Sequence, residues 1–168
     1  MFKTFYPGEY LDSTYVIEFE KLYIDGYRGL IFDIDNTLVE HGVVADQRVI
    51  DLFEKLRKIG FHTCLISNNQ ESRVRPFADK VQTMFVSNAH KPSTVNYIKA
   101  MEMMETDKKN TIFIGDQLFT DVWGANRAEI RTILVRPIGK KEEIQIVLKR
   151  YLEKIVLYFY KRSIKRKV

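Results

Sequence analysis

The sequence predicts an α/β fold: a three-layer, Rossmann-like arrangement in which a parallel sheet of five strands carries helices on both faces. Two observations predict it. From residue 30 onward, short apolar runs alternate with longer segments in which apolar residues recur at helical spacing. The runs are also too uniformly apolar to leave one face in water, which is typical of parallel strands joined by right-handed crossovers and covered on both sides.

The apolar runs are the predicted strands: 30–32, 61–66, 84–86, 111–114 and 131–135. The segments between and after them are predicted to be helical: 46–59, 70–80, 93–104, 120–128, and 142 to about 163. Gly60 suits the position that follows the first of these helices. We expect Pro76 near the start or a kink of the second helix and Pro92 in the opening turn of the third, because proline lacks the N–H that an interior position donates.

Length and composition indicate one globular domain. The chain has 168 residues, of which 45% are hydrophobic and 29% charged, and this apolar content is enough for a core of ordinary size. We expect a single domain over 1–168, with an N-terminal extension at 1–28 and a basic amphipathic helix at about 142–168. We see neither repeats nor a flexible linker that would divide the chain.

Cysteine usage and hydropathy predict a cytoplasmic protein. Cys64 is the only cysteine, so no disulfide can form within the chain and a reducing compartment is expected. The first residues, MFKTFYPGEY, lack the apolar stretch of a signal peptide. The longest apolar run near the C-terminus, 155–160, is far shorter than the roughly 20 residues that span a bilayer. We therefore expect no transmembrane segment.

Polar side chains follow four of the predicted strands. Because ligands of parallel α/β sheets bind beyond the carboxyl ends of the strands, these side chains are the candidate site. In chain order they are Asp33 and Asp35; Ser67, Asn68 and Asn69; His90 and Lys91; and Asp116 and Asp121.

The chemistry of this set fits a metal ion and a phosphoryl group. Asp33, Asp35 and Asp116 offer the hard oxygen ligands that Mg²⁺ prefers, and the cation would offset the repulsion among them. Ser67 can donate a hydrogen bond to a phosphoryl oxygen, and Lys91 can neutralise its charge. Phosphoryl transfer depends mainly on such positioning and charge compensation.

This set, in this order, resembles the motifs of the haloacid dehalogenase-like (HAD) phosphatases. The first motif, Asp-x-Asp-x-Thr after a strand, matches residues 33–37; the second matches Ser67, the third Lys91, and the fourth Gly115-Asp116 with the later Asp121. The resemblance implies the HAD fold over about 30–140 and a phosphatase activity.

The resemblance also implies roles for these residues. Asp33 would be the nucleophile that forms an aspartyl-phosphate, and Asp35 the general acid and base. Mg²⁺ would be held by Asp33, Asp116 and the backbone carbonyl of Asp35, with Asp121 as a further ligand or as a residue that orients the ligands. The residues expected to bind the substrate phosphate are Thr37, Ser67, Asn68 and Lys91.

HAD phosphatases select substrates largely through cap domains at two insertion points, and neither point has room for one here. Seven residues separate Leu38 from Asp46, and four separate Val86 from Lys91. We therefore expect an open site that suits a large substrate or one displayed on a surface. A homo-oligomer is an alternative source of the missing wall.

The C-terminal tail carries the net positive charge of the protein. Residues 149–168 hold eight basic residues against one acidic residue, a net charge of +7, whereas the whole chain carries +5. Three interpretations remain open: a helix packed on the sheet with a solvated basic end, attachment to an anionic membrane surface, or contact with nucleic acid, which we do not favour.

The chain also resembles the YqeG-type subgroup and the mitochondrial phosphatidylglycerophosphate phosphatases. The shared stretches are IFDIDNTLV, SNN, His-Lys-Pro at 90–92, and GDQLFTDVWGANR. This resemblance implies hydrolysis of phosphatidylglycerophosphate, at the inner face of a membrane that the protein contacts peripherally.

Two alternatives remain. One is a capless phosphatase acting on a soluble nucleotide, sugar or protein phosphate. The other is a non-enzymatic, receiver-like phosphoacceptor, but this would need an acidic residue after the third strand, and none lies between Val86 and Lys91.

Overall fold

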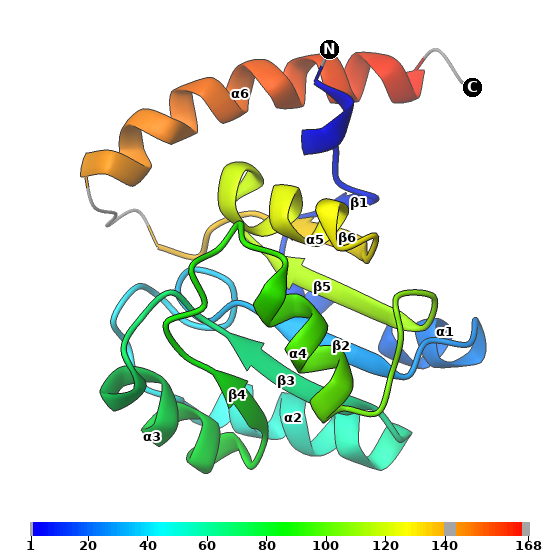
Figure 1. Cartoon of the computed structure of the whole chain (residues 1–168), viewed down its shortest axis with the longest axis vertical. Helices are drawn as coiled ribbons and strands as arrows, with labels where there is room; N and C mark the ends of the chain where they lie inside the picture. Colours follow the sequence, from blue (N-terminus) through cyan, green and yellow to red (C-terminus); the bar gives the residue numbers. More distant parts are fainter. Residues whose placement is uncertain (1, 140–143, 166–168) are drawn as a thin grey trace.

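The fold is built on one parallel sheet. The structure is a computed structural model that describes residues 2–139 and 144–165. The strand order is β1-β6-β5-β2-β3-β4 (Figure 1). The strands are β1 (Glu9–Leu11), β2 (Gly29–Phe32), β3 (His62–Ile66), β4 (Met84–Val86), β5 (Thr111–Gly115) and β6 (Arg131–Val135). All neighbouring pairs are parallel, so the predicted α/β class is confirmed.

The predicted count of five strands is one too low. β1 lies in the segment that the sequence marks only as an N-terminal extension, and it pairs with β6 at the edge of the sheet. Its three residues are only half-buried, so they form no apolar run that would identify a strand. The same segment also contains the 3₁₀ turns η1 (Lys3–Phe5) and η2 (Thr14–Val16) and the helix α1 (Phe19–Ile24).

The remaining helices follow the predicted order. They are α2 (Gln47–Ile59), α3 (Glu71–Val81), α4 (Val95–Met103), the π-helical turn η3 (Leu118–Val122), α5 (Trp123–Arg127) and α6 (Ile144–Lys165). The side chain of Asp46 caps α2 by accepting a hydrogen bond from the N–H of Val49, and Gly60 ends the helix at φ 111°.

Pro76 lies inside α3 and not at its start, so only the expected kink still applies to it. Two details differ from the sequence-based expectation. Pro92 lies before α4, after a cis peptide bond. The helix expected at 120–128 begins at Leu118 with a π-helical turn. The expected helix start at 142 and the basic residues at 166 and 167 lie outside the described residues.

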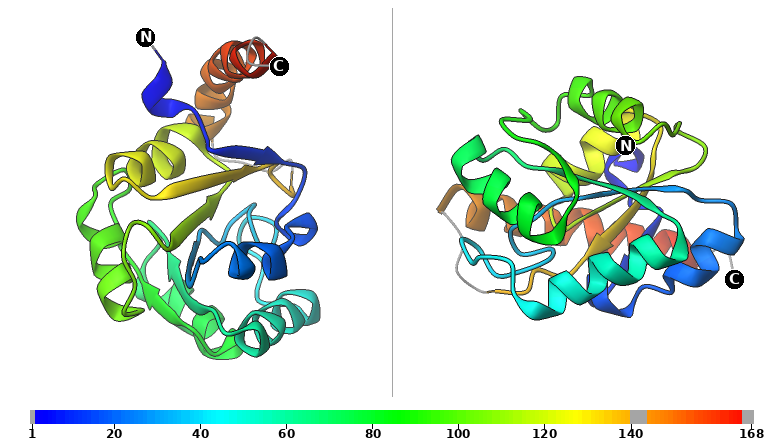
Figure 2. Two further views of the ribbon diagram at one scale, coloured as in Figure 1. Left: turned by 90° about the vertical axis from the view of Figure 1, so that its right-hand side faces the viewer. Right: turned by 90° about the horizontal axis from the view of Figure 1, so that it is seen from below.

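Helices cover both faces of the sheet, as expected (Figure 2). Residues of α1, α2 and α3 share one buried apolar cluster with one face of the strands; in it the rings of Phe32 and Phe53 lie 5.3 Å apart. Residues of α4 and α5 share a second cluster with the other face, where the rings of Tyr97 and Phe113 lie 5.2 Å apart. In the described residues the two possible cap positions are short loops, so no cap domain is present there.

The helix α6 lies beside the N-terminal segment, away from the centre of the sheet (Figure 1). Val156 and Tyr160 are buried on one side of α6, and the ring of Tyr160 lies 5.5 Å from that of Tyr6. The other side is exposed and includes Leu148, Tyr151, Leu152 and Ile155. No helix in the described part of the chain combines the length and hydropathy that a membrane span requires.

Two neighbouring residues of α6 test this packing. Val156 is 3% exposed and Ile155 is 51% exposed. We expect Val156→Ala to lower the free energy of unfolding by about 1–2 kcal/mol, because it leaves a cavity. Ile155→Ala should change it by less than about 0.5 kcal/mol, because it removes exposed atoms. Urea denaturation followed by circular dichroism measures both, and equal effects would contradict the docked position of α6.

Candidate active site

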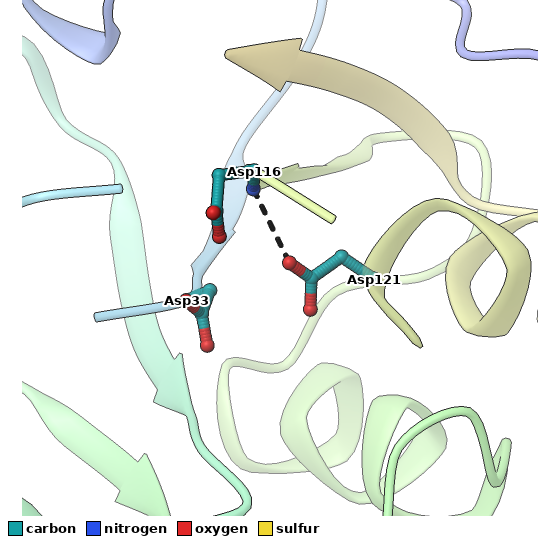
Figure 3. A group of neighbouring side chains, drawn as sticks. All are labelled: Asp33, Asp116 and Asp121. Carbon is teal, nitrogen blue, oxygen red and sulfur yellow. Dashed lines mark hydrogen bonds between the residues drawn. The ribbon is translucent and has the colours of Figure 1, made fainter. Parts of the chain in front are cut away.

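Adjacent strand ends bring two carboxylates together. Asp33 follows β2 and Asp116 is the residue after β5, and these strands are neighbours in the sheet. The N–H of Asp33 donates to the carbonyl of Ile114 at 3.0 Å, which fixes the register at this end. Asp121 joins the pair from η3. One carboxylate oxygen from each of the three residues lies within 4.8 Å of the others, and all three residues are buried (Figure 3).

Lys91 supplies positive charge to this acidic cluster. Its Nζ lies 2.5 Å from Oδ1 of Asp33 and 2.7 Å from Oδ1 of Asp121. Burial favours the neutral amine, but the carboxylates of Asp121 and Asp33 outweigh it and raise the pKa of Lys91 above its ordinary value. Lys91 is therefore an ammonium ion inside the cluster.

The cluster nevertheless carries more negative charge than its environment favours. Burial raises the pKa of Asp33 to about 7, although Lys91 acts in the opposite direction. Burial, followed by the charges of Asp33 and Asp121, also raises the pKa of Asp116 well above its ordinary value, against the effect of Arg150. Such shifts mark carboxylates that a further cation would stabilise in the ionised form.

Asp121 holds the loop that carries Asp116. Its Oδ2 accepts hydrogen bonds from the N–H of Asp116 at 3.2 Å (Figure 3) and from that of Gln117 at 3.1 Å. This close approach requires a glycine at position 115, where an added Cβ would lie 2.6 Å from Oδ2 of Asp121. Both oxygens of Asp121 therefore have partners within the protein.

The carboxylate of Asp35 is held apart from the acidic cluster. It accepts hydrogen bonds from Nδ2 of Asn69 at 2.7 Å, from the N–H of Gly42 at 2.8 Å and from Arg73 at 3.0 Å. The chain turns immediately after it, because Asn36 has a left-handed backbone conformation with φ 63°. The side chain of Asp35 lines the cavity and is not one of the three clustered carboxylates.

The predicted phosphate-binding residues occupy different positions around the site. Ser67 is buried beside the cavity, and its hydroxyl accepts from the N–H of Asn69 at 3.1 Å. The amide of Asn68 contacts the backbone of Lys91 through both its oxygen and its nitrogen. The hydroxyl of Thr37 lies 3.3 Å from Oδ1 of Asp116. In the described structure, Thr37 and Asn68 thus contact other site residues.

A cavity of about 210 Å³ opens above these groups. Its lining is Asp33, Asp35, His41, Ser67, Asn68, Asn69, Lys91, Gln117, Thr120 and Lys149. Lys149 belongs to α6, so this helix contributes to the wall that a cap domain would otherwise supply. His41 lines the cavity, whereas His90 is exposed and is not part of the lining.

Sequence reasoning missed two arginines that touch the site. Arg73 of α3 pairs with Asp35, and Arg150 of α6 pairs with Asp116. Arg73 lies close to the Ser-Asn-Asn stretch in sequence, which is a weak signal. Arg150 is one of many basic residues in the tail, and nothing in the sequence distinguishes it from the others.

Comparison with known proteins agrees with this geometry. A sequence profile described as HAD-hydrolase-like matches residues 88–147. Over 162 residues the chain is 37% identical to a protein named Probable phosphatase YqeG from Bacillus subtilis, and the match covers 96% of this chain and 94% of that protein.

Solved structures share the fold at low sequence identity. The HAD-hydrolase YfnB from Bacillus subtilis, solved with bound magnesium, superposes with a TM-score of 0.54 at 14% identity, covering 71% of this chain and 91% of that one. A protein from Corynebacterium glutamicum superposes with a TM-score of 0.53 at 19% identity, covering 78% of this chain and 93% of that one. The sequence match to YqeG covers nearly the whole of both chains, and the matching sequence profile is HAD-hydrolase-like. The chain therefore belongs to the HAD-like family of hydrolases.

Proposed function

We propose that the protein is a Mg²⁺-dependent phosphatase that hydrolyses a phosphomonoester through an aspartyl-phosphate on Asp33. One observation carries the proposal: Asp33 lies at the end of β2, in contact with Lys91 and within reach of two further carboxylates, and it lines an open cavity. A nucleophile, a counter-cation and candidate metal ligands thus share one small space.

The donor set fits a divalent cation. Asp33, Asp116 and Asp121 offer converging carboxylate oxygens, which hard cations such as Mg²⁺ prefer. The raised pKa values of Asp33 and Asp116 indicate that an additional cation would stabilise their ionised carboxylates. When bound, the ion would neutralise charge on the transferring phosphoryl group.

The residues of the chain would divide the reaction into two steps. In the first, an oxygen of Asp33 attacks phosphorus and the bond to the leaving alcohol breaks, while Asp35 donates a proton to that alcohol. In the second, Asp35 takes a proton from water as the water attacks phosphorus, which releases phosphate and restores Asp33. Lys91 and the hydroxyl of Ser67 would hold the phosphoryl oxygens.

We further propose phosphatidylglycerophosphate as the substrate, hydrolysed in the cytoplasm at the inner face of the membrane. No cap domain is present in the described residues, so a lipid headgroup could enter while its acyl chains stay in the bilayer. The exposed side of α6 supports this, because it combines Tyr151, Leu152 and Ile155 with basic residues. Such a face suits the surface of an anionic bilayer, where each basic residue contributes about 1 kcal/mol.

A soluble phosphomonoester remains the second candidate. Lys149 of α6 lines the cavity, so the open side is partly walled within one chain. A wall of this kind would give a small anionic metabolite a further basic contact.

The metal and the nucleophile can be tested together. We expect phosphate release in Mg²⁺ to stop on addition of EDTA and to fall to background in Asp33→Asn, because no carboxylate remains to attack phosphorus. Asp35→Asn should lower kcat by about 10²–10⁴-fold through loss of the general acid and base. The measurement is the rate at which inorganic phosphate is released.

The control variant is Glu54→Gln, at an exposed position on α2, which should release phosphate at the native rate. Full activity in Asp33→Asn would exclude the mechanism.

The charge of the cluster predicts a pH-dependent stability. In the folded, metal-free protein the pKa of Asp33 is raised from 3.8 to about 7. Asp33 therefore contributes stability that is fully present below about pH 4 and is lost as the pH rises through about 7. In EDTA at pH 7.5, Asp33→Asn should unfold at a higher temperature than the native protein, and this difference should shrink toward pH 4.5.

Thermal unfolding followed by circular dichroism measures this difference. Glu54→Gln is the control, because it makes the same kind of change from a carboxyl to an amide group at an exposed position on α2. A native protein that is more stable than Asp33→Asn at pH 7.5 would show that the buried charge is already compensated.

Lipid and soluble substrates can be separated with one variant. We expect the native enzyme to release phosphate from phosphatidylglycerophosphate in phosphatidylglycerol vesicles, and the rate to fall as salt rises. The double change Tyr151→Ser and Leu152→Ser should lower this rate but leave hydrolysis of soluble p-nitrophenyl phosphate unchanged.

The control is Ile24→Ser, which replaces an apolar residue of α1 that is 82% exposed and lies outside α6. It should leave both activities unchanged. Rapid release from a soluble metabolite phosphate, with none from the lipid, would reject the lipid substrate and leave the chemistry intact.

A further inference from the structure

The helix α6 contacts the backbone and the side chain of a candidate metal ligand. Nη1 of Arg150 donates to the backbone carbonyl of Asp116 at 2.6 Å, and Nη2 forms an ion pair with Oδ2 of the same residue. The Arg150 side chain is only 16% exposed. The guanidinium thus spans both acceptors of Asp116, a planar two-point contact that an ammonium group cannot reproduce.

Glu153, one turn further along α6, completes this contact. Its Oε1 accepts from the N–H of Leu118 at 2.7 Å, and its Oε2 accepts from Nη1 of Arg150 at 2.9 Å. Glu153 is 5% exposed, and a buried carboxylate is stable only when such partners satisfy it. Arg150 and Glu153, here called the α6 clamp, therefore hold the loop 116–118 at both ends.

The clamp leaves the two oxygens of Asp116 in different environments. Oδ2 is paired with Arg150. Oδ1 lies 3.3 Å from the hydroxyl of Thr37, and that hydroxyl also lies 3.5 Å from Oδ2 of Asp33. Oδ1 therefore lies on the side of the acidic cluster, while Oδ2 is turned toward α6.

We propose that Arg150 is a positioning residue for the divalent-ion site, which holds Asp116 so that Oδ1 faces Asp33 and Asp121. The proposal rests on the proposed function only in that these carboxylates bind a divalent ion. It adds that the affinity for this ion depends on α6, a helix outside the HAD-like motifs.

Arg150 has two opposing effects on the affinity of the site for a divalent ion: it orients a ligand, and it repels the incoming cation. Loss of a residue that orients a metal ligand typically lowers metal affinity by about 10–100-fold. Loss of a nearby positive charge would instead raise the affinity, because less repulsion acts on the incoming cation. We expect orientation to dominate, since Arg150 holds both the carbonyl and the carboxylate of Asp116.

The test measures metal binding directly, without an activity assay. Mn²⁺ is titrated into metal-free protein, and free Mn²⁺ is counted by electron paramagnetic resonance. We expect Arg150→Met to raise the Kd by about 10-fold or more. Arg150→Lys, which keeps the charge but loses the planar contact, should fall between native and Arg150→Met. Glu153→Gln, which keeps an acceptor for the N–H of Leu118, should raise the Kd by a smaller factor.

Two control variants separate positioning from general effects. Lys154→Met removes a charge from the same helix at a position whose Nζ lies over the ring of Tyr151. Val81→Ala lowers stability from α3, because Val81 is buried in the apolar cluster that α1, α2 and α3 form on one face of the sheet. Both should bind Mn²⁺ with native affinity. Far-ultraviolet circular dichroism establishes that each variant is folded, and Glu153→Gln and Arg150→Lys keep the proposal testable if Arg150→Met does not fold.

Each outcome is decisive. A weaker Kd in Arg150→Met with unchanged controls supports the positioning role. An unchanged Kd, or a tighter one, overturns it while leaving the metal site in place. Absence of Mn²⁺ binding by the native protein would overturn the metal site itself, and with it both the proposed function and this inference.

Discussion

Three buried carboxylates within reach of one cation are the constraint on which the rest of the structure depends. Like charges at this distance repel, and burial makes each of them costly unless a positive group is near. Lys91 contacts Asp33 and Asp121 from one side, and Arg150 contacts Asp116 from another. The parallel sheet brings Asp33 and Asp116 together, because β2 and β5 are neighbours. The site therefore follows from strand order and from the placement of two cations.

The two ends of the described chain form one structural unit beside this site. The ring of Phe2 stacks on that of Phe159 at 5.9 Å, and Nζ of Lys161 lies 5.4 Å from the centre of the Tyr10 ring. These contacts fix the C-terminal half of α6, while Arg150 fixes its beginning against Asp116. The helix is therefore both packed and exposed: one side stabilises the fold and the site, and the other presents apolar and basic groups to the surroundings. The sequence pattern had suggested these as competing interpretations.

Most of the sheet could be predicted from the sequence, because buried parallel strands are continuous apolar runs. Asp33 and Asp116 could be predicted to lie together for the same reason, since each follows such a run and parallel strands end at one edge. The strand β1 could not be predicted, because its three half-buried residues form no continuous apolar run. Arg150 could not be singled out either: helical spacing shows which residues share a side of α6, but only the packed structure shows which side meets Asp116. The π-helical turn, from which Asp121 reaches Lys91, could not be predicted either, because helical spacing in a sequence does not distinguish it from an α-helix.

The short strand β1 has a consequence for the behaviour of the protein in concentrated solution. By pairing with β6, it occupies the hydrogen-bonding groups of a strand that is almost entirely buried and rich in β-branched residues. An uncovered strand of that kind would be a template on which a second molecule could add its own strand, and so a starting point for aggregation. The edge of the sheet is therefore formed by the three half-buried residues of β1 and not by the five residues of β6. This shorter edge offers a second molecule fewer groups to pair with.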